Sequence, residues 1–145
     1  QAWDRRSKYL HVKLFGHAKS ASAKKFFLSL LESASYKVRS IQVDGGSEFK
    51  AEFEDACAEI GLELIVLPPA MPKYNGGVER GNRTFREEFY ASVNVGVDSI
   101  GAMRNYLRDA LRKYNEYRPH FGLQGLTPLE YIKNDLLEIN NLSHI

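Results

Sequence analysis

Two carboxylates that stand beside glycines are the residues of this chain best suited to chemistry. Asp44 is followed by two glycines, and Glu79 comes shortly after a second pair, Gly76-Gly77. A pair of carboxylates with one or two hard divalent cations suits phosphoryl transfer. Glycosidases also use two acids, but nothing in the sequence offers a platform for a sugar. Each motif taken alone is weak, since Asp-Gly-Gly is also an ordinary turn.

Arginines accompany Glu79 along the stretch Pro72–Tyr90, PKYNGGVERGNRTFREEFY. The pattern is helical from about residue 78, and its expected core-facing stripe is Val78, Asn82, Phe85 and Phe89. On the neighbouring face, Arg83 and Arg86 would hold phosphates beside Glu79. The same spacing also fits a surface Glu–Arg pair at i, i+4, which contributes only a few tenths of a kcal/mol.

Alternating strands and helices are expected to position these residues. Strands are predicted at Ser7–Phe15, Val38–Val43 and Leu62–Leu67, the last apolar enough to be covered on both faces. Asp44 then falls at the carboxyl end of a strand, where open α/β sheets bind ligands. The order of elements predicts an α/β layer with a helical C-terminal flank over residues 98–145.

The predicted helices have recognisable ends and apolar faces. The first is Ser20–Ser35, with Ser20 or Ser22 as N-cap, and the second is Glu48–Ile60, which Gly61 ends. A loop at Pro68–Tyr74 precedes the third helix, residues 78–90. The fourth is Ser99–Tyr117, capped by Asp98, and a fifth begins at the capping box Thr127–Glu130. The buried stripes are expected to be Phe49, Phe53, Cys57 and Ile60, and then Ile100, Met103, Leu107, Leu111 and Tyr114.

Composition describes an ordinary globular chain. The 145 residues are 43% apolar and 26% charged, with a net charge of +2, so a polyanion partner is permitted but not required. Cys57 is the single cysteine, which excludes an internal disulfide and a cysteine-based zinc site. No membrane span or signal peptide is recognisable, and we expect a cytoplasmic protein without a membrane partner.

Four segments together resemble the catalytic core of retroviral-type integrases and bacterial insertion-sequence transposases. They are DGGSEF at Asp44–Phe49, YNGGVERGNRTFREEF at Tyr74–Phe89, YNEYRPHFGLQGLTPLEYI at Tyr114–Ile132, and SKYLHVKLF at Ser7–Phe15. The resemblance spans roughly residues 3–132. It implies a ribonuclease-H-like mixed sheet flanked by helices, in one catalytic core domain over residues 1–145.

The resemblance also implies roles for individual residues. That family uses two aspartates and a glutamate to hold Mg²⁺ or Mn²⁺, and Asp44 and Glu79 match the second aspartate and the glutamate, 35 positions apart. The remaining DNA-binding candidates, beside Arg83 and Arg86, are Lys73, Asn75 and Arg80.

Two positions depart from the family pattern. Gly45 stands where the family normally has asparagine, which would loosen the hydrogen bonding around Asp44. The family's first catalytic aspartate should precede the segment at Ser7, so we expect it upstream of Gln1, with the first strand of the sheet. Asp4 matches a non-catalytic family position instead. The chain as given is therefore expected to be inactive by itself.

The sequence thus predicts metal-dependent DNA strand transfer by an integrase or transposase core that forms a homo-oligomer. The alternative is a truncated, non-catalytic remnant that binds DNA or its own kind. A ribonuclease or junction-resolving nuclease on the same fold is disfavoured, because those families lack the Arg-Pro-His and Thr-Pro-x-Glu tail. Cys57 is expected to fill the core, and His120 to pack or hydrogen-bond in a turn.

Overall fold

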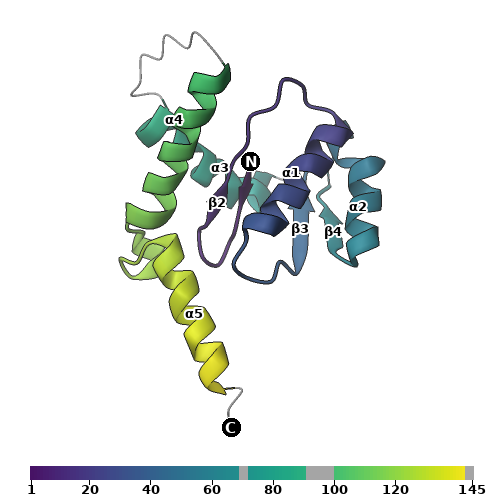
Figure 1. Cartoon of the computed structure of the whole chain (residues 1–145). Coiled ribbons are helices and arrows are strands. Elements are labelled where there is room, and N and C mark those ends of the chain that lie inside the picture. Colours follow the sequence, from purple (N-terminus) through teal and green to yellow (C-terminus); the bar gives the residue numbers. More distant parts are fainter. Residues whose placement is uncertain (69–71, 91–99, 143–145) are drawn as a thin grey trace. The chain divides into compact units, whose positions relative to one another are not determined.

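The computed structural model describes residues 1–68, 72–90 and 100–142. It divides into two compact units, one formed by residues 1–13 and 76–145 and the other by residues 14–75 (Figure 1). In the described residues, no helix is long and apolar enough to cross a membrane.

The unit of residues 14–75 packs two helices on two parallel strands. Its elements are α1 (Ser20–Ser33), β3 (Ser40–Val43), the 3₁₀ turn η1 (Ser47–Phe49), α2 (Glu52–Ile60) and β4 (Glu63–Val66). Strands β3 and β4 pair in parallel, with Ser40 opposite Glu63. The core between helices and strands centres on Phe27, Phe53 and Cys57, and the rings of the two phenylalanines lie 5.5 Å apart. Burial of Cys57 confirms its predicted place in the core.

Helix α2 receives its N-terminal cap from another helix. Ser20, in the first turn of α1, accepts a hydrogen bond from the Phe53 N–H at 3.2 Å and donates one to the Lys50 carbonyl. Lys19 occupies the N-cap position of α1 without a side-chain cap, so the predicted Ser20 or Ser22 cap is wrong. At the other end of α2, Gly61 adopts φ 70°, the left-handed conformation expected of a residue that ends a helix.

The other unit joins a short hairpin to the remaining helices. Its elements are β1 (Ala2–Trp3), β2 (Leu10–His11), most of α3 (Pro72–Phe85), the π-helical turns η2 (Arg86–Tyr90) and η3 (Lys113–Tyr117), α4 (Ile100–Arg112), the 3₁₀ turn η4 (Phe121–Leu123) and α5 (Pro128–Leu142). Strands β1 and β2 are antiparallel, with Trp3 opposite Leu10.

One buried side chain ties the hairpin to the helices. The Asn115 amide accepts a hydrogen bond from the Leu10 N–H at 3.0 Å and donates one to the Leu10 carbonyl at 2.9 Å. Both residues are buried, with exposed fractions of 5% and 1%. The amide therefore pairs with the backbone as another strand would, at a position where water cannot replace it.

The predicted capping box at the start of α5 is confirmed. Glu130 accepts a hydrogen bond from the Thr127 N–H at 2.8 Å, and Thr127 Oγ1 accepts one from the Glu130 N–H at 3.3 Å. Pro128 occupies the first helical position, where its missing N–H has no effect on the hydrogen-bond ladder. The helical part predicted for residues 98–145 is present over the described residues.

Several predicted boundaries are wrong. Helix α3 begins at Pro72 rather than near Val78, and it runs through Gly76-Gly77, because proline suits a first helical turn and helical glycine costs only about 1 kcal/mol. The strand expected over Ser7–Phe15 is reduced to β2, and its partner β1 was not predicted.

Three predicted burials are also wrong. Strand β4 was expected to be covered on both faces, yet Ile65 is 39% and Val66 is 51% exposed. Ile60 and Ile100, assigned to buried stripes, are 49% and 61% exposed. In the described residues β4 pairs with a single strand, β3, and Ile60 and Ile100 stand at the very ends of α2 and α4, where few neighbours cover an apolar side chain. Asp98, the predicted cap, lies outside the described residues.

We predict that Asn115→Ala lowers the free energy of unfolding by about 2–4 kcal/mol, because it removes two hydrogen bonds and leaves a buried N–H and C=O unpaired. Urea denaturation measures this change. The control is Asn105→Ala on the exposed part of α4, which should change stability by less than about 0.5 kcal/mol. Equal stabilities of the two variants would contradict the structural role of Asn115.

Candidate functional site

Asp44 stands immediately after β3, as predicted, with an exposed side chain. Its Oδ1 accepts a hydrogen bond from the Gly46 N–H at 3.3 Å, which turns the chain away from the strand. A Cβ on Gly46 would come within 2.6 Å of Glu48 Oε2 and 3.1 Å of Asp44 Oδ1. A side chain at position 46 would displace the Glu48 carboxylate, so glycine here lets the two carboxylates lie close to each other.

Glu48 was missed as a neighbour of Asp44. The sequence predicts only that Glu48 begins a helix, where an acid interacts favourably with the N-terminus, and this placement does not reveal where the carboxylate points. The signal in the sequence was the spacing of Asp44 and Glu48 across two glycines.

Glu79 lies on α3 with Arg80 and Arg83, and Arg86 begins the following turn η2; all four side chains are exposed. Arg83 pairs with Glu87 at 3.5 Å, one turn further along the helix. Among the described residues, Glu79 makes no ion pair, so the alternative of a simple Glu79–Arg83 surface pair is not what the structure contains.

The opposite side of α3 packs against its own unit. Gly81 and Phe85 are buried, whereas Asn82 is exposed, so the predicted stripe is wrong at Asn82. A Cβ on Gly81 would lie 3.1–3.3 Å from the Trp3 indole ring. Gly81 allows this close approach, and glycine within an otherwise helical pattern was the signal for it. The side chains of Val78 and Phe89 lie outside the described residues.

The structure does not test the predicted roles of Lys73 and Asn75, or the shared site of Asp44 and Glu79. The side chains of Lys73 and Asn75 lie outside the described residues. Asp44 belongs to the unit of residues 14–75 and Glu79 to the other unit, so their shared site stays a prediction. Among the described residues, no group of three or more His, Cys, Asp or Glu side chains could hold a metal ion.

Asp4 has a structural role in the hairpin. Its Oδ2 accepts hydrogen bonds from the Ser7 N–H at 2.6 Å and from Ser7 Oγ at 2.5 Å. The Asp4 backbone also bonds to Tyr9 and Lys8 across the turn between β1 and β2. A carboxylate oxygen used twice in a turn is poorly placed to bind a metal, in agreement with the predicted non-catalytic position.

A cluster that the sequence did not reveal joins the end of α3 to the segment after η3. Arg118 donates from Nε and Nη2 to both oxygens of Glu88, at 2.5 and 2.6 Å. This bond lowers the pKa of Glu88 and raises that of Arg118. Arg118 also lies over the Tyr114 ring at 5.7 Å, and His120 packs edge-on against the same ring. The predicted packing of His120 in a turn is confirmed.

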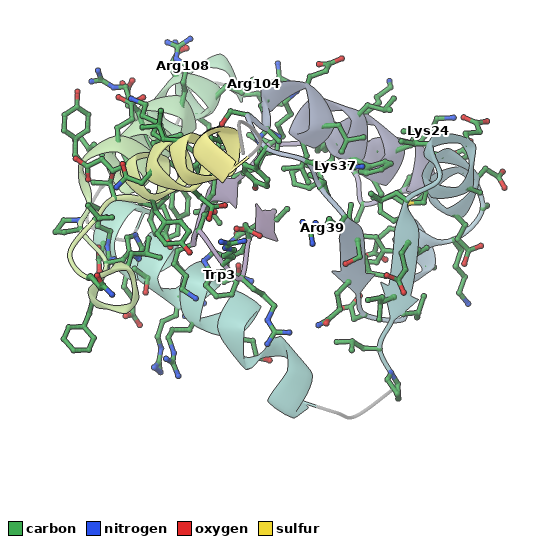
Figure 2. All side chains as sticks on the ribbon, turned by 90° about the horizontal axis from the view of Figure 1, so that it is seen from below. Trp3, Lys24, Lys37, Arg39, Arg104 and Arg108 are labelled. Carbon is green, nitrogen blue, oxygen red and sulfur yellow. The ribbon has the colours of Figure 1, made fainter. Side chains whose placement is uncertain are left out.

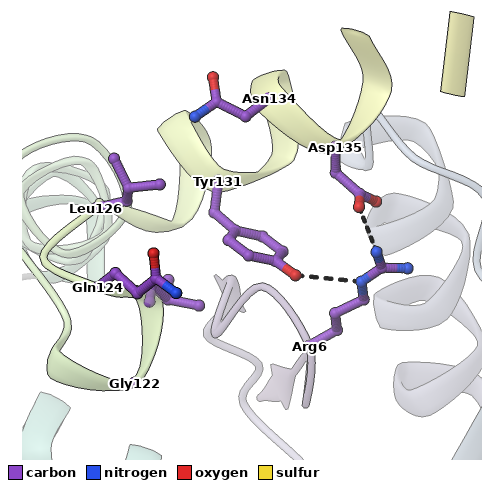
Figure 3. Close-up of a pocket in the computed structure, with 8 residues that line it drawn as sticks. Arg6, Gly122, Gln124, Leu126, Tyr131, Asn134 and Asp135 are labelled. Atoms are coloured by element: carbon purple, nitrogen blue, oxygen red, sulfur yellow. Dashed lines mark hydrogen bonds and ion pairs between the residues drawn. The ribbon is translucent and has the colours of Figure 1, made fainter. Parts of the chain in front are cut away.

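Basic and polar side chains also gather elsewhere. Figure 2 shows Arg104 and Arg108 projecting from α4, one helical turn apart. A pocket of about 470 Å³ lies beside Arg6, which donates to Tyr131 Oη at 3.3 Å and pairs with Asp135. Figure 3 shows these three side chains at the pocket. Because Asp135 already neutralises Arg6, this pocket offers no unpaired charge to a ligand.

Comparison with known proteins identifies a shared family segment. Residues 60–128 match the family described as integrase core domain. A protein of insertion element IS476 from Xanthomonas euvesicatoria is 29% identical over 97 residues, which cover 66% of this chain and 28% of that protein. The putative transposase InsD of element IS2E from Escherichia coli K12 is 32% identical over 91 residues, covering 62% and 41%. The chain thus spans well under half the length of these relatives.

Solved structures show the same fold. The catalytic core domain of BIV integrase superposes with a TM-score of 0.74 and 22% identity, covering 94% of this chain and 86% of that one. The simian T-cell lymphotropic virus intasome in complex with PP2A regulatory subunit B56 gamma gives a TM-score of 0.72 and 22% identity, covering 81% and 42%. The fold is therefore that of a retroviral integrase catalytic core, which is ribonuclease-H-like.

Sequence and structure point to the same class of protein. The family segment, the insertion-element relatives and the integrase folds together support an integrase or transposase core. The resemblance inferred from the sequence motifs is confirmed.

We predict that stability falls as the pH falls from about 6.5 to 4. Burial lowers the pKa of His11 and of His120 to about 4, with Lys13 adding to the effect at His11 and Arg118 at His120. The unfolded histidines have a pKa near 6.5, so within this window the unfolded chain binds more protons than the folded one. Thermal unfolding midpoints measured from pH 7 to pH 4 should decrease accordingly.

His120→Gln should flatten this pH dependence, and the exposed His17→Gln should leave it unchanged. The loss of the Glu88–Arg118 bond, which Glu88 protonation weakens, is expected only toward the lower end of the range, because the pKa of Glu88 is itself lowered. Parallel curves for the wild type and His120→Gln would contradict a half-buried His120 that stays neutral in the folded protein.

Proposed function

We propose that this chain acts as the catalytic core of a mobile-element integrase or transposase, which joins the 3′ hydroxyls of element ends to target DNA. The observation that carries the proposal is the division of α3: Glu79 stands exposed with Arg83 and Arg86, while Gly81 and Phe85 are buried on the other side. An acid beside cations on one open helical face suits a metal-bound phosphodiester.

Integrase cores generally use divalent metal, and Asp44 and Glu79 supply the hard oxygen ligands that Mg²⁺ prefers. When bound, the metal would lower the barrier by stabilising charge on the attacking and departing oxygens. In the reaction, the 3′-hydroxyl oxygen loses its proton to solvent and forms a P–O bond, while the target strand's P–O3′ bond breaks and its oxygen is protonated. Arg83 and Arg86 would hold the phosphates in line for this exchange.

The second candidate is a non-catalytic remnant that binds DNA or associates with itself. It is favoured by the hydrogen bonding of Asp4 to Ser7 and by the lack of a three-ligand group among the described residues. Assembly into a homo-oligomer, a single mixed sheet within one core domain, and a cytoplasmic location all remain predictions.

We predict that Asp44→Asn or Glu79→Gln in the intact protein lowers metal-dependent strand transfer by about 10²–10³-fold, because a lost ligand removes several kcal/mol of transition-state stabilisation. Joining of labelled element-end DNA in Mg²⁺ or Mn²⁺ measures this rate. DNA affinity should stay within about twofold of the wild type. The matched control is Glu59→Gln, an exposed acid on α2, which should retain full activity. Retained activity in either ligand variant would exclude the assignment.

We predict that Arg83→Ala combined with Arg86→Ala weakens DNA binding without unfolding the protein. The slope of log K against log salt concentration should fall by about 2, since each arginine neutralises one phosphate. The Arg83–Glu87 pair is 69% and 60% exposed, so its loss should cost less than about 1 kcal/mol of stability. Lys133→Ala on α5 serves as the basic control. An unchanged salt slope with a large loss of stability would mean that both arginines are structural.

A further inference from the structure

We propose that Glu88 and Arg118 are positioning residues for Glu79, because their ion pair holds the far end of the helix whose open face carries Glu79. The inference rests on the proposed function of Glu79 and adds to it two residues that make no contact with DNA or metal in that proposal.

The contacts of α3 and η2 form a row along one side. Gly81 lies against Trp3, and Phe85 packs on Tyr114 with ring centroids 6.2 Å apart at 71°. Glu88 then bonds to Arg118. These three positions are spaced i, i+4 and i+7, so they follow one face of the helix. We call Gly81, Phe85 and Glu88 the docking row.

Glu79, Arg83 and Arg86 lie on the other side. At 3.6 residues per turn, Glu79 is about 120° from Phe85 and about 160° from Gly81 around the helix axis. A rotation of the helix that broke the docking row would therefore turn Glu79 toward the protein by the same angle. The orientation of the exposed carboxylate is thus determined by contacts on the reverse side.

The ion pair lies where the helical geometry is least regular. Glu88 belongs to the π-helical turn η2, and Arg118 directly follows the π-helical turn η3. Isolated π-helical turns are frequent at functional sites, because a widened turn re-aims the residues that follow it. Both partners of this bond are therefore presented by turns that depart from the α-helix.

Arginine suits this position better than lysine. Its planar group makes two parallel hydrogen bonds to Glu88, lies over the Tyr114 ring, and places Nη1 3.3 Å from His120 Nδ1. Lysine would keep the charge but lose the fork and the stacking. The side chains of Arg118 and Glu88 are 26% and 43% exposed, and partly exposed pairs add little to stability. The fixed geometry of the pair is its distinctive feature.

Trp3 provides a direct reporter of the helix position. It is the only tryptophan of the chain, and its indole lies against Gly81 in the docking row. A helix that tilts or rotates away from Trp3 would admit water to the ring. The fluorescence emission of the protein should then shift to longer wavelength, without any need for DNA, metal or activity.

The test compares Arg118→Lys and Glu88→Gln with a matched control. Arg6→Lys changes a second arginine–carboxylate pair of this unit, Arg6–Asp135, which is not part of the docking row. In the intact protein we expect Arg118→Lys and Glu88→Gln to shift Trp3 emission to longer wavelength. We also expect them to lower strand transfer at least tenfold and to raise the Mg²⁺ concentration for half-maximal activity, with the DNA affinity changed less than twofold. Arg6→Lys should change none of these.

The charge exchange Glu88→Arg with Arg118→Glu restores the attraction and should recover part of the activity and the original emission. Full activity in Arg118→Lys, while Glu79→Gln is inactive, would overturn the positioning role and leave the proposed function intact. Full activity in Glu79→Gln would refute the proposed function itself. If Arg118→Lys and the exchanged pair both lose cooperative unfolding, the bond is structural and the positioning role is refuted.

Discussion

The amide of Asn115 is the contact on which the larger unit depends. It pairs with both backbone groups of Leu10, which lies 105 positions away in the chain, and both residues are buried. A hairpin with two residues in each strand has too few ladder bonds to persist by itself. The amide extends that ladder with a side chain and fixes the place of β1. Trp3 on β1 then supplies the surface that Gly81 approaches.

Helix α3 has two sides with opposite requirements. The docking row needs close contact, and Gly81 permits it at the expense of about 1 kcal/mol of helix propensity. The other side is open, and Glu79, Arg83 and Arg86 are exposed there. Arg83 pairs with Glu87 one turn further along, so a packed side and an open side coexist on one helix.

The sequence predicted most helices well because their signals are local. The capping box at Thr127, the left-handed Gly61 and the burial of Phe53 follow from residues within one or two turns of each other. The strands were predicted poorly. Only Leu10 and His11 of a nine-residue alternating segment form β2, because a strand exists only where a partner strand pairs with it, and alternation cannot reveal where the partner ends.

The sequence by itself determined the two glycine-flanked acids, their spacing and the family resemblance that the comparisons confirmed. It also determined that Arg83 and Arg86 share a face with Glu79, because helical periodicity fixes that relation. Only the tertiary structure decided that Arg118 binds Glu88, 30 positions away, that Asn115 pairs with Leu10, and that Asp44 shares the space beside Gly46 with Glu48. Periodicity and capping act over a few residues. These pairings instead depend on how the elements pack, and on the requirement that buried polar and charged groups form hydrogen bonds.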